Sequence, residues 1–216
     1  MQETASKPVA FRSEGLTLEG ILHQPVPALV PAPFPAAAVC HPHPLYGGDM
    51  NNYVVVAVCQ ALAEAGIASL GFNFRGVGRS EGEYGDGLGE RADAAAALVY
   101  LRQLETVDPD KVGIVGYSFG AAVALAAADE RVAAVAAISP PSLGQGVPDL
   151  AVHCPTLLIS GEQDEIAPPA SLSALATTIG PHCQMSVVRG ADHFWPGYEK
   201  ELAQVVAQFF RECLIG

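Results

Sequence analysis

Short apolar runs alternate with alanine-rich helical stretches along almost the whole chain, and this pattern constrains the fold most strongly. Runs such as "AAAVC" (36–40) and "PTLLISG" (155–161) are nearly continuous in apolar residues. Strands of this kind are buried on both faces, so the pattern predicts an α/β fold, a mainly parallel sheet with helices on both faces. Residues 9–25 instead alternate apolar and polar residues around Glu14 and Gly15, which predicts an antiparallel hairpin.

Length and charge limit the organisation and the partners of the chain. Its 216 residues show no repeat, charge block or linker, so we expect one α/β domain over residues 1–216. The formal net charge of -12 argues against nucleic acid and anionic membranes as partners, because both reward Lys and Arg. A small-molecule substrate stays compatible with this charge. The sequence leaves the oligomeric state open between monomer and homodimer.

The N-terminus and the cysteines indicate the compartment. No apolar run follows a basic start, and no apolar stretch is long enough to cross a bilayer unbroken. The five cysteines are scattered, odd in number and without Cys-x-x-Cys spacing. These features predict a cytoplasmic protein with reduced, mostly buried thiols.

Two pentapeptides have the form Gly-x-Ser-x-Gly, which is typical of a strand-to-helix turn that exposes a reactive serine. In "GYSFG", Ser118 directly follows an apolar run and precedes "AAVALAAA", which gives a strand, a sharp turn and a helix. In "GRSEG", Ser80 lies inside a glycine-rich loop with no helix after it. We therefore predict Ser118 as a nucleophile, with a helix N-cap as its alternative role, and Ser80 as a loop residue.

A serine nucleophile needs an adjacent base, and that base needs a carboxylate to orient it. Among the six histidines, His193 in "GADHFWPG" follows a strand end. It also lies downstream of Ser118, as the chain order serine, acid, histidine requires. His193 is therefore the predicted base.

Several carboxylates compete for the role of the acid. The segment "GEQDEIAPP" offers Glu162, Asp164 and Glu165 just past a strand. Asp164 is the predicted acid, because it lies in the turn that leaves the sheet. Asp149 is the fallback, and Asp192, next to the histidine, is interpreted as structural.

With these residues in order, the chain resembles the α/β-hydrolase superfamily over nearly all of its length. The loop "HPHPLYGGDMNN" (41–52) narrows the resemblance to the small dienelactone-hydrolase-like branch. Dienelactone hydrolases proper use a cysteine at the turn, so Ser118 indicates ordinary carboxylesters instead. The resemblance implies a mainly parallel, eight-stranded sheet. It rests on four segments: "FNFRGVGRSEG", "GYSFG", "GEQDEIAPP" and "GADHFWPG".

The resemblance also implies an oxyanion hole made of two backbone N–H groups. One should come from Phe119, the residue after the nucleophile, and the other from the loop after the third strand. Pro42 and Pro44 have no N–H to offer. If "HPL" (43–45) is the counterpart of the family's "HG-x" turn, the resemblance implies Leu45 as the second donor, with His43 as the alternative.

Two further features have alternative interpretations. His41 and His43 in "HPHP" would allow a shared cation, but no third ligand is evident, so a rigid loop is preferred. Arg75 would suit an acidic substrate group, but an internal tie to nearby loops is preferred. We expect no metal and no organic cofactor.

The predicted function is that of a serine hydrolase, a carboxylesterase that works through Ser118, His193 and Asp164 and an acyl-enzyme. Residues 140–154 are too few for a helical cap after the sixth strand, so an open site and small or short-chain esters are expected. The alternatives are lactone, thioester or amide hydrolysis or perhydrolysis with the same triad. A catalytically silent binding module on the same fold is the alternative from another class.

Overall fold

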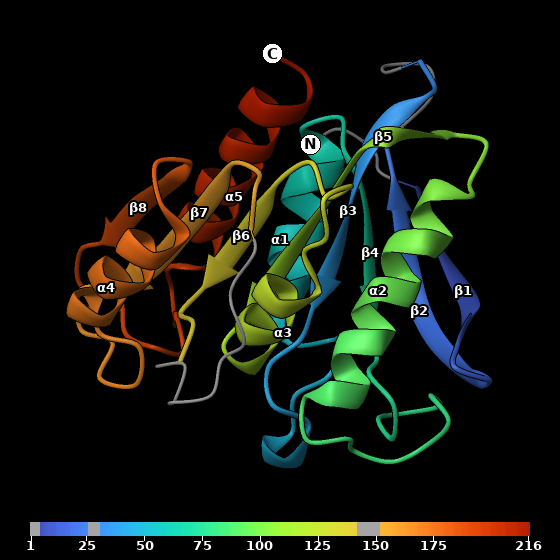
Figure 1. Cartoon of the computed structure of the whole chain (residues 1–216), viewed down its shortest axis with the longest axis horizontal. Helices are drawn as coiled ribbons and strands as arrows, with labels where there is room; N and C mark the ends of the chain where they lie inside the picture. Colours follow the sequence, from blue (N-terminus) through green and yellow to red (C-terminus); the bar gives the residue numbers. More distant parts are fainter. Residues whose placement is uncertain (1–4, 26–30, 142–151) are drawn as a thin grey trace.

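The computed structural model describes residues 5–25, 31–141 and 152–216. Within these residues, eight strands form one sheet in the order β1-β2-β4-β3-β5-β6-β7-β8 (Figure 1). The β1–β2 and β2–β4 pairs are antiparallel, and all other neighbours are parallel. The strands are β1 (Ala5–Ser13), β2 (Leu16–Gln24), β3 (Phe34–Cys40), β4 (Ala68–Phe72), β5 (Val107–Tyr117), β6 (Val135–Ile138), β7 (Thr156–Gly161) and β8 (Cys183–Val188).

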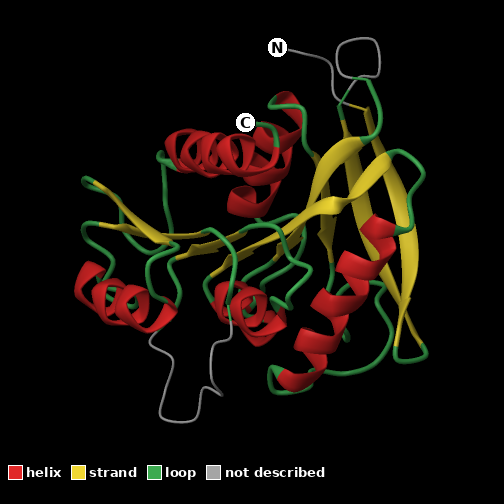
Figure 2. Cartoon of the chain, turned by 45° about the horizontal axis from the view of Figure 1, so that its top comes forward, coloured by secondary structure: helices red, strands yellow, loops and turns green. Residues whose placement is uncertain are grey.

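Helices cover both faces of the sheet, and Figure 2 shows the sheet between two helical layers. Among the described residues, one layer holds three α-helices and the other holds two, each with its own apolar core against the sheet. This arrangement confirms the predicted fold class. The first layer comprises α2 (Leu88–Arg102), α3 (Phe119–Ala127) and α4 (Pro169–Ile179), and the second comprises α1 (Tyr53–Glu64) and α5 (Glu199–Leu214).

The elements follow from the patterns in the sequence. Every residue of β3 is buried, as expected for a strand covered on both faces. Along α5 the buried side chains recur at helical spacing, while Gln204 and Gln208 face solvent. The predicted hairpin is confirmed: Glu14 and Gly15 have φ angles of 48° and 90°, and Ser13 pairs with Leu16. Two successive positive φ angles match the right-handed twist of a tight hairpin.

Helix α2 begins earlier than the sequence indicated. The glycine-rich segment "VGRSEGEYGDGLGE" (77–90) predicts a loop, but the helix starts at Leu88. The buried side chain of Glu90 accepts hydrogen bonds from the backbone N–H groups of Gly85 (2.9 Å) and Gly87 (2.7 Å). This capping box closes the glycine-rich turn and starts the helix.

The parallel strands place several loops at one edge of the sheet. Ser118 follows β5, Asp164 follows β7 and His193 follows β8, so their loops leave the sheet at its carboxyl edge. Between β6 and β7 the described residues, 139–141 and 152–155, hold no helix. In the described parts of the chain no helix is both long enough and apolar enough to span a membrane. All five cysteines are free thiols.

Candidate active site

The backbone at Ser118 forms a strained turn between β5 and α3. Ser118 has a φ angle of 55°, which is uncommon for any residue other than glycine. A Cβ atom at Gly116 would lie 2.0 Å from the carbonyl oxygen of Gly120. A Cβ atom at Gly120 would lie 2.5 Å from the carbonyl oxygens of Cys40 and His41. Both positions therefore require glycine, and the turn that they permit lifts the Ser118 side chain above the sheet edge.

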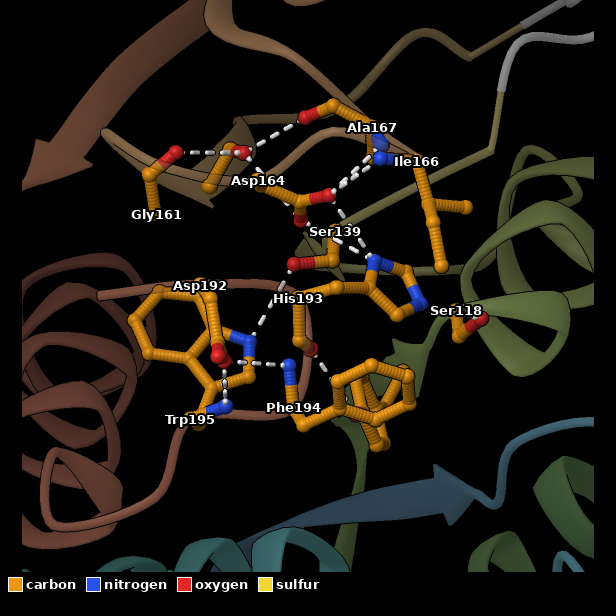
Figure 3. Close-up of polar contacts among 12 residues, drawn as sticks. Ser118, Ser139, Gly161, Asp164, Ile166, Ala167, Asp192, His193, Phe194 and Trp195 are labelled. Carbon is orange, nitrogen blue, oxygen red and sulfur yellow. Dashed lines mark hydrogen bonds and ion pairs between the residues drawn. The ribbon is translucent and has the colours of Figure 1, made fainter.

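Ser118, His193 and Asp164 form one chain of hydrogen bonds. The Ser118 Oγ atom lies 3.0 Å from Nε2 of His193, and Nδ1 of His193 lies 3.0 Å from both carboxylate oxygens of Asp164 (Figure 3). The histidine and the aspartate are buried, and the serine is half-buried. With its Nδ1–H donated to the carboxylate, a neutral His193 offers the Nε2 lone pair to the serine hydroxyl.

The surroundings of Asp164 favour its charged form. Its Oδ1 atom accepts backbone N–H groups from Ile166 (3.0 Å) and Ala167 (2.7 Å). Burial raises the pKa of this carboxyl, but hydrogen bonds from His193, Ala167 and Ser139 outweigh burial, and the pKa lies below its usual value. The carboxylate therefore stays ionised where it can orient His193.

The competing carboxylates have other surroundings. Glu162 is exposed and accepts a backbone N–H from the turn after β8, at 3.0 Å. Glu165 is exposed. Asp192 accepts two backbone N–H groups from its own turn, as its structural interpretation expected. Asp149 lies outside the described residues. Among the carboxylates of the described residues, Asp164 is thus the one that hydrogen-bonds the His193 ring.

Ser139 was missed by the sequence reasoning, which took it as the end of a strand. It follows β6, is fully buried and has a φ angle of 45°. Its hydroxyl donates to Asp164 and accepts the indole N–H of Trp195 at 3.1 Å (Figure 3). Trp195 is also fully buried, so the two side chains form a rigid support behind the carboxylate. The position of Ser139 at the carboxyl end of a parallel strand would place it near the site edge, but it does not indicate these contacts.

Two tyrosines, also missed, hold the backbone around His193. The Tyr117 hydroxyl donates to the carbonyl of His193 at 2.9 Å. The Tyr53 hydroxyl, from the start of α1, donates to the carbonyl of Phe194. These bonds tie the histidine turn to two different elements, so its ring is positioned by more than its own loop.

The predicted oxyanion donors differ in their availability. Phe119 is the first residue of α3, so its N–H has no partner within the helix. The N–H of Leu45 donates to Nδ1 of His43 at 3.2 Å, as part of the cap of the short helix η1 (Pro44–Tyr46). The N–H of Leu45 therefore already has a partner in its own loop, and its role as an oxyanion donor stays a prediction. The N–H of His43 has no hydrogen-bond partner among the described residues.

The metal interpretation of the two loop histidines fails on their contacts. His41 is fully buried; its Nδ1–H donates to the Pro42 carbonyl at 2.6 Å, and its Nε2 accepts the Phe74 N–H at 3.1 Å. Nδ1 of His43 accepts the Leu45 N–H. The ring nitrogens of both histidines are therefore engaged in contacts within the protein, and no pair of lone pairs is left to bind a shared cation. In the described residues no three His, Cys, Asp or Glu side chains gather as a metal site.

The buried His41 should make stability depend on pH. Burial lowers its pKa from 6.5 to about 4, so the unfolded chain binds a proton that the folded chain does not. The contribution of His41 to the free energy of unfolding is therefore fully present above pH 6.5. It falls by about 3 kcal/mol as the pH is lowered toward 4. We expect the free energy of unfolding in urea to fall over this range. In His41→Gln, which keeps an acceptor for the backbone but does not titrate, the fall should be smaller; parallel curves would contradict the prediction.

Ser80 and Ser118 have different surroundings. The Ser80 hydroxyl donates to the carbonyl of Asn73 at 2.7 Å and accepts the N–H of Glu19 at 3.1 Å. Ser80 is buried at 7% exposure between these backbone groups. It ties the loop after β4 to the hairpin strand β2, in agreement with its interpretation as a loop residue.

Arg75 is an internal tie. Its guanidinium makes two hydrogen bonds to the fully buried carboxylate of Asp93, at 2.8 and 3.0 Å, and one to Glu14 at 3.1 Å. The hydrogen bonds to Asp93 raise the pKa of the guanidinium, although burial opposes them. Ser13 donates to the same carboxylate at 2.7 Å. With its donors used in this way, Arg75 links the loop after β4 to α2 and to the hairpin.

The chain matches two protein families and is similar to an uncharacterised relative. Residues 22–149 match the family of the X-Pro dipeptidyl-peptidases (S15 family), and residues 91–210 match the PET hydrolase-like family. An uncharacterised protein of Rickettsia prowazekii is 33% identical over 186 residues, which cover 81% of this chain and 78% of the relative.

Two solved structures resemble the chain over nearly their whole length. An α/β serine hydrolase homologue from Coxiella burnetii is 33% identical, with a TM-score of 0.84, over 94% of this chain and 96% of that one. An α/β serine hydrolase without a lid from Xanthomonas campestris is 30% identical, with a TM-score of 0.85, over 100% of this chain and 97% of that one.

Proposed function

The chain belongs to the α/β-hydrolase superfamily, and from this premise we propose that it is a carboxylesterase that acts on small or short-chain esters. The observation that carries the proposal is the chain of hydrogen bonds from the Ser118 hydroxyl through His193 to Asp164. A serine held in a strained turn, a base within reach and an ionised orienting group are the three requirements of acyl transfer.

In the first step, His193 accepts the hydroxyl proton through Nε2 while the Ser118 oxygen attacks the ester carbonyl carbon. Asp164 stabilises the imidazolium that forms. The backbone N–H groups of Phe119 and His43 are the proposed donors to the oxyanion, with His43 taking the place first given to Leu45. The imidazolium then gives its proton to the leaving alcohol, and Ser118 carries the acyl group.

In the second step, water takes the place of the alcohol. His193 accepts a proton from this water as its oxygen attacks the acyl carbon, and the same two N–H groups hold the second oxyanion. Collapse of this intermediate returns the proton to Ser118 and releases the carboxylic acid. Each step uses groups of the chain and water.

The length of the acyl chain tests the proposed substrate class. The described residues between β6 and β7 hold no helix that would form an apolar tunnel over Ser118. We therefore expect kcat/KM to be highest for p-nitrophenyl acetate and butyrate, and at least about tenfold lower for the decanoate and longer esters. The measurement is initial-rate hydrolysis across the series, with Ser118→Ala as background. A maximum at long chains would contradict this substrate class.

A further inference from the structure

We infer that the preferred substrate carries an uncharged aromatic acyl group, which packs against four rings beside Ser118. This inference rests on the proposed esterase function and specifies its substrate. The four rings are those of His43, Tyr46, Tyr84 and Phe119, and they are named the ring cluster here. They come from the loops after β3 and β4 and from the start of α3, which meet at the carboxyl edge of the sheet.

The rings of the cluster contact one another closely. The His43 ring is the centre, with ring centroids 4.7 Å from Phe119, 4.8 Å from Tyr46 and 5.2 Å from Tyr84. The Tyr84 and Phe119 centroids are 6.0 Å apart. All these distances lie in the range at which aromatic rings attract one another, so the cluster is one continuous aromatic surface.

The sheet order places this cluster on one side of Ser118. Phe119 follows Ser118 directly, while the other rings come from the loops after β3 and β4. In the sheet, β3 and β4 lie on one side of β5, and β7 and β8, which carry Asp164 and His193, lie on the other. The alcohol oxygen of an ester must face His193 to receive its proton. The acyl group therefore extends away from His193, toward the ring cluster.

Exposed apolar side chains occur in the cluster and next to its members in the sequence. Tyr46 of the cluster is 88% exposed, its neighbour Leu45 is 67% exposed and Leu88 is 79% exposed. A Cβ at Gly87, the residue before Leu88, would lie 3.9 Å from the Phe119 ring, so the start of α2 borders the cluster. Exposed apolar side chains next to a reactive group indicate a binding surface for an apolar group.

The polar atoms of the His43 ring have partners within the cluster and its loop. Nδ1 of His43 accepts the Leu45 N–H, so in the neutral ring Nε2 carries the proton, 3.3 Å from the Tyr84 hydroxyl oxygen. These two contacts hold the His43 ring in one orientation. A ligand ring therefore packs against a His43 ring that is already ordered. The protein should lose little conformational entropy when the ligand binds.

The charges near the cluster disfavour anions. Burial raises the pKa of the Tyr84 hydroxyl, and the carboxylates of Glu90 and Asp86 add to this effect. Arg75, in the same loop as Tyr84, is neutralised by Asp93 and Glu14. A negatively charged acyl group would meet these carboxylates without a free cation from Arg75, so the acyl group should be uncharged.

Methyl esters test the inference without an aromatic leaving group. Methyl 3-phenylpropanoate and methyl hexanoate both have a saturated carbon next to the carbonyl, so their intrinsic reactivities are similar. We expect kcat/KM, followed by acid release, to be about fivefold or more higher for the aromatic ester. A carboxylate in the para position of its ring should lower kcat/KM at least about tenfold.

Variants of Tyr46 test whether the ring cluster causes the preference for the aromatic ester. Tyr46→Ala should lower the ratio of the two kcat/KM values about fivefold, and Tyr46→Phe, which keeps the ring, should retain it. Val99→Ala, a matched change at an exposed apolar residue of α2, should change neither value. Equal kcat/KM for the two esters, or a ratio unaltered by Tyr46→Ala, would overturn the inference while leaving the esterase proposal intact. Failure of wild type to exceed Ser118→Ala on any ester would overturn both.

Discussion

Ser118→Ala is expected to lower the turnover of simple esters by at least about a thousandfold, with the fold unchanged. The hydroxyl is the proposed attacking group, and it is held by the turn and by Nε2 of His193 at 3.0 Å. Alanine keeps the Cβ atom and fits the same backbone space, so the loss should be chemical and not structural. His193→Ala should cause a loss of similar size, because without the base the serine hydroxyl is a poor nucleophile.

The measurements are hydrolysis of p-nitrophenyl acetate and labelling by a fluorophosphonate probe. Ser80→Ala is the matched control, because Ser80 lies in the other Gly-x-Ser-x-Gly pentapeptide. Its hydroxyl bonds only backbone groups, so this change should lower stability by about 1–3 kcal/mol and leave turnover nearly unchanged. No labelling of wild type would favour a silent binding module instead, and undiminished labelling of Ser118→Ala would mean that another residue is the nucleophile.

Much of the fold could be predicted because its signals are local and repeated. The hairpin follows from alternation around Glu14 and Gly15, and the covered sheet follows from strands such as β3 in which every residue is apolar. The predicted start of α2 was wrong, because apolar periodicity does not mark where this helix begins. The start depends on a buried carboxylate, Glu90, that closes a turn rich in glycines, and glycines in a sequence indicate a loop.

The residues of the candidate site divide in the same way. Ser118, Asp164 and His193 follow strand ends in a fixed chain order, so the sequence pointed to them, and the structure holds them in one hydrogen-bonded chain. Their catalytic roles stay a prediction. Ser139 and Tyr117 act through contacts between residues far apart in sequence, which no local pattern reveals. The same holds for the hydrogen bond from the N–H of Leu45, which depends on the orientation of the His43 ring.

Asp164→Asn should lower kcat by about ten-thousandfold while changing KM little, because it should place the wrong tautomer of His193 beside the serine. Ile166 and Ala167 donate N–H groups to Oδ1, so the amide oxygen of asparagine should take that position. Its NH₂ group then occupies the position of Oδ2, 3.0 Å from Nδ1 of His193. This NH₂ group opposes an Nδ1–H, although Oδ1 also lies 3.0 Å from Nδ1. We therefore expect the proton to move to Nε2, which leaves no lone pair for the Ser118 hydroxyl.

Asp192→Asn is the matched control for this tautomer argument. Asp192 lies next to His193 in the chain, and its Oδ1 accepts two backbone N–H groups that an amide oxygen can also accept. The Asp192→Asn substitution makes the same change of charge beside the same histidine, but the side chain at 192 bonds backbone groups and not the His193 ring. Turnover should therefore stay within about threefold of wild type. Steady-state kinetics on p-nitrophenyl acetate compare the two variants. A loss below about tenfold in Asp164→Asn, or equal losses in both, would mean that orientation by this carboxylate does not set the rate.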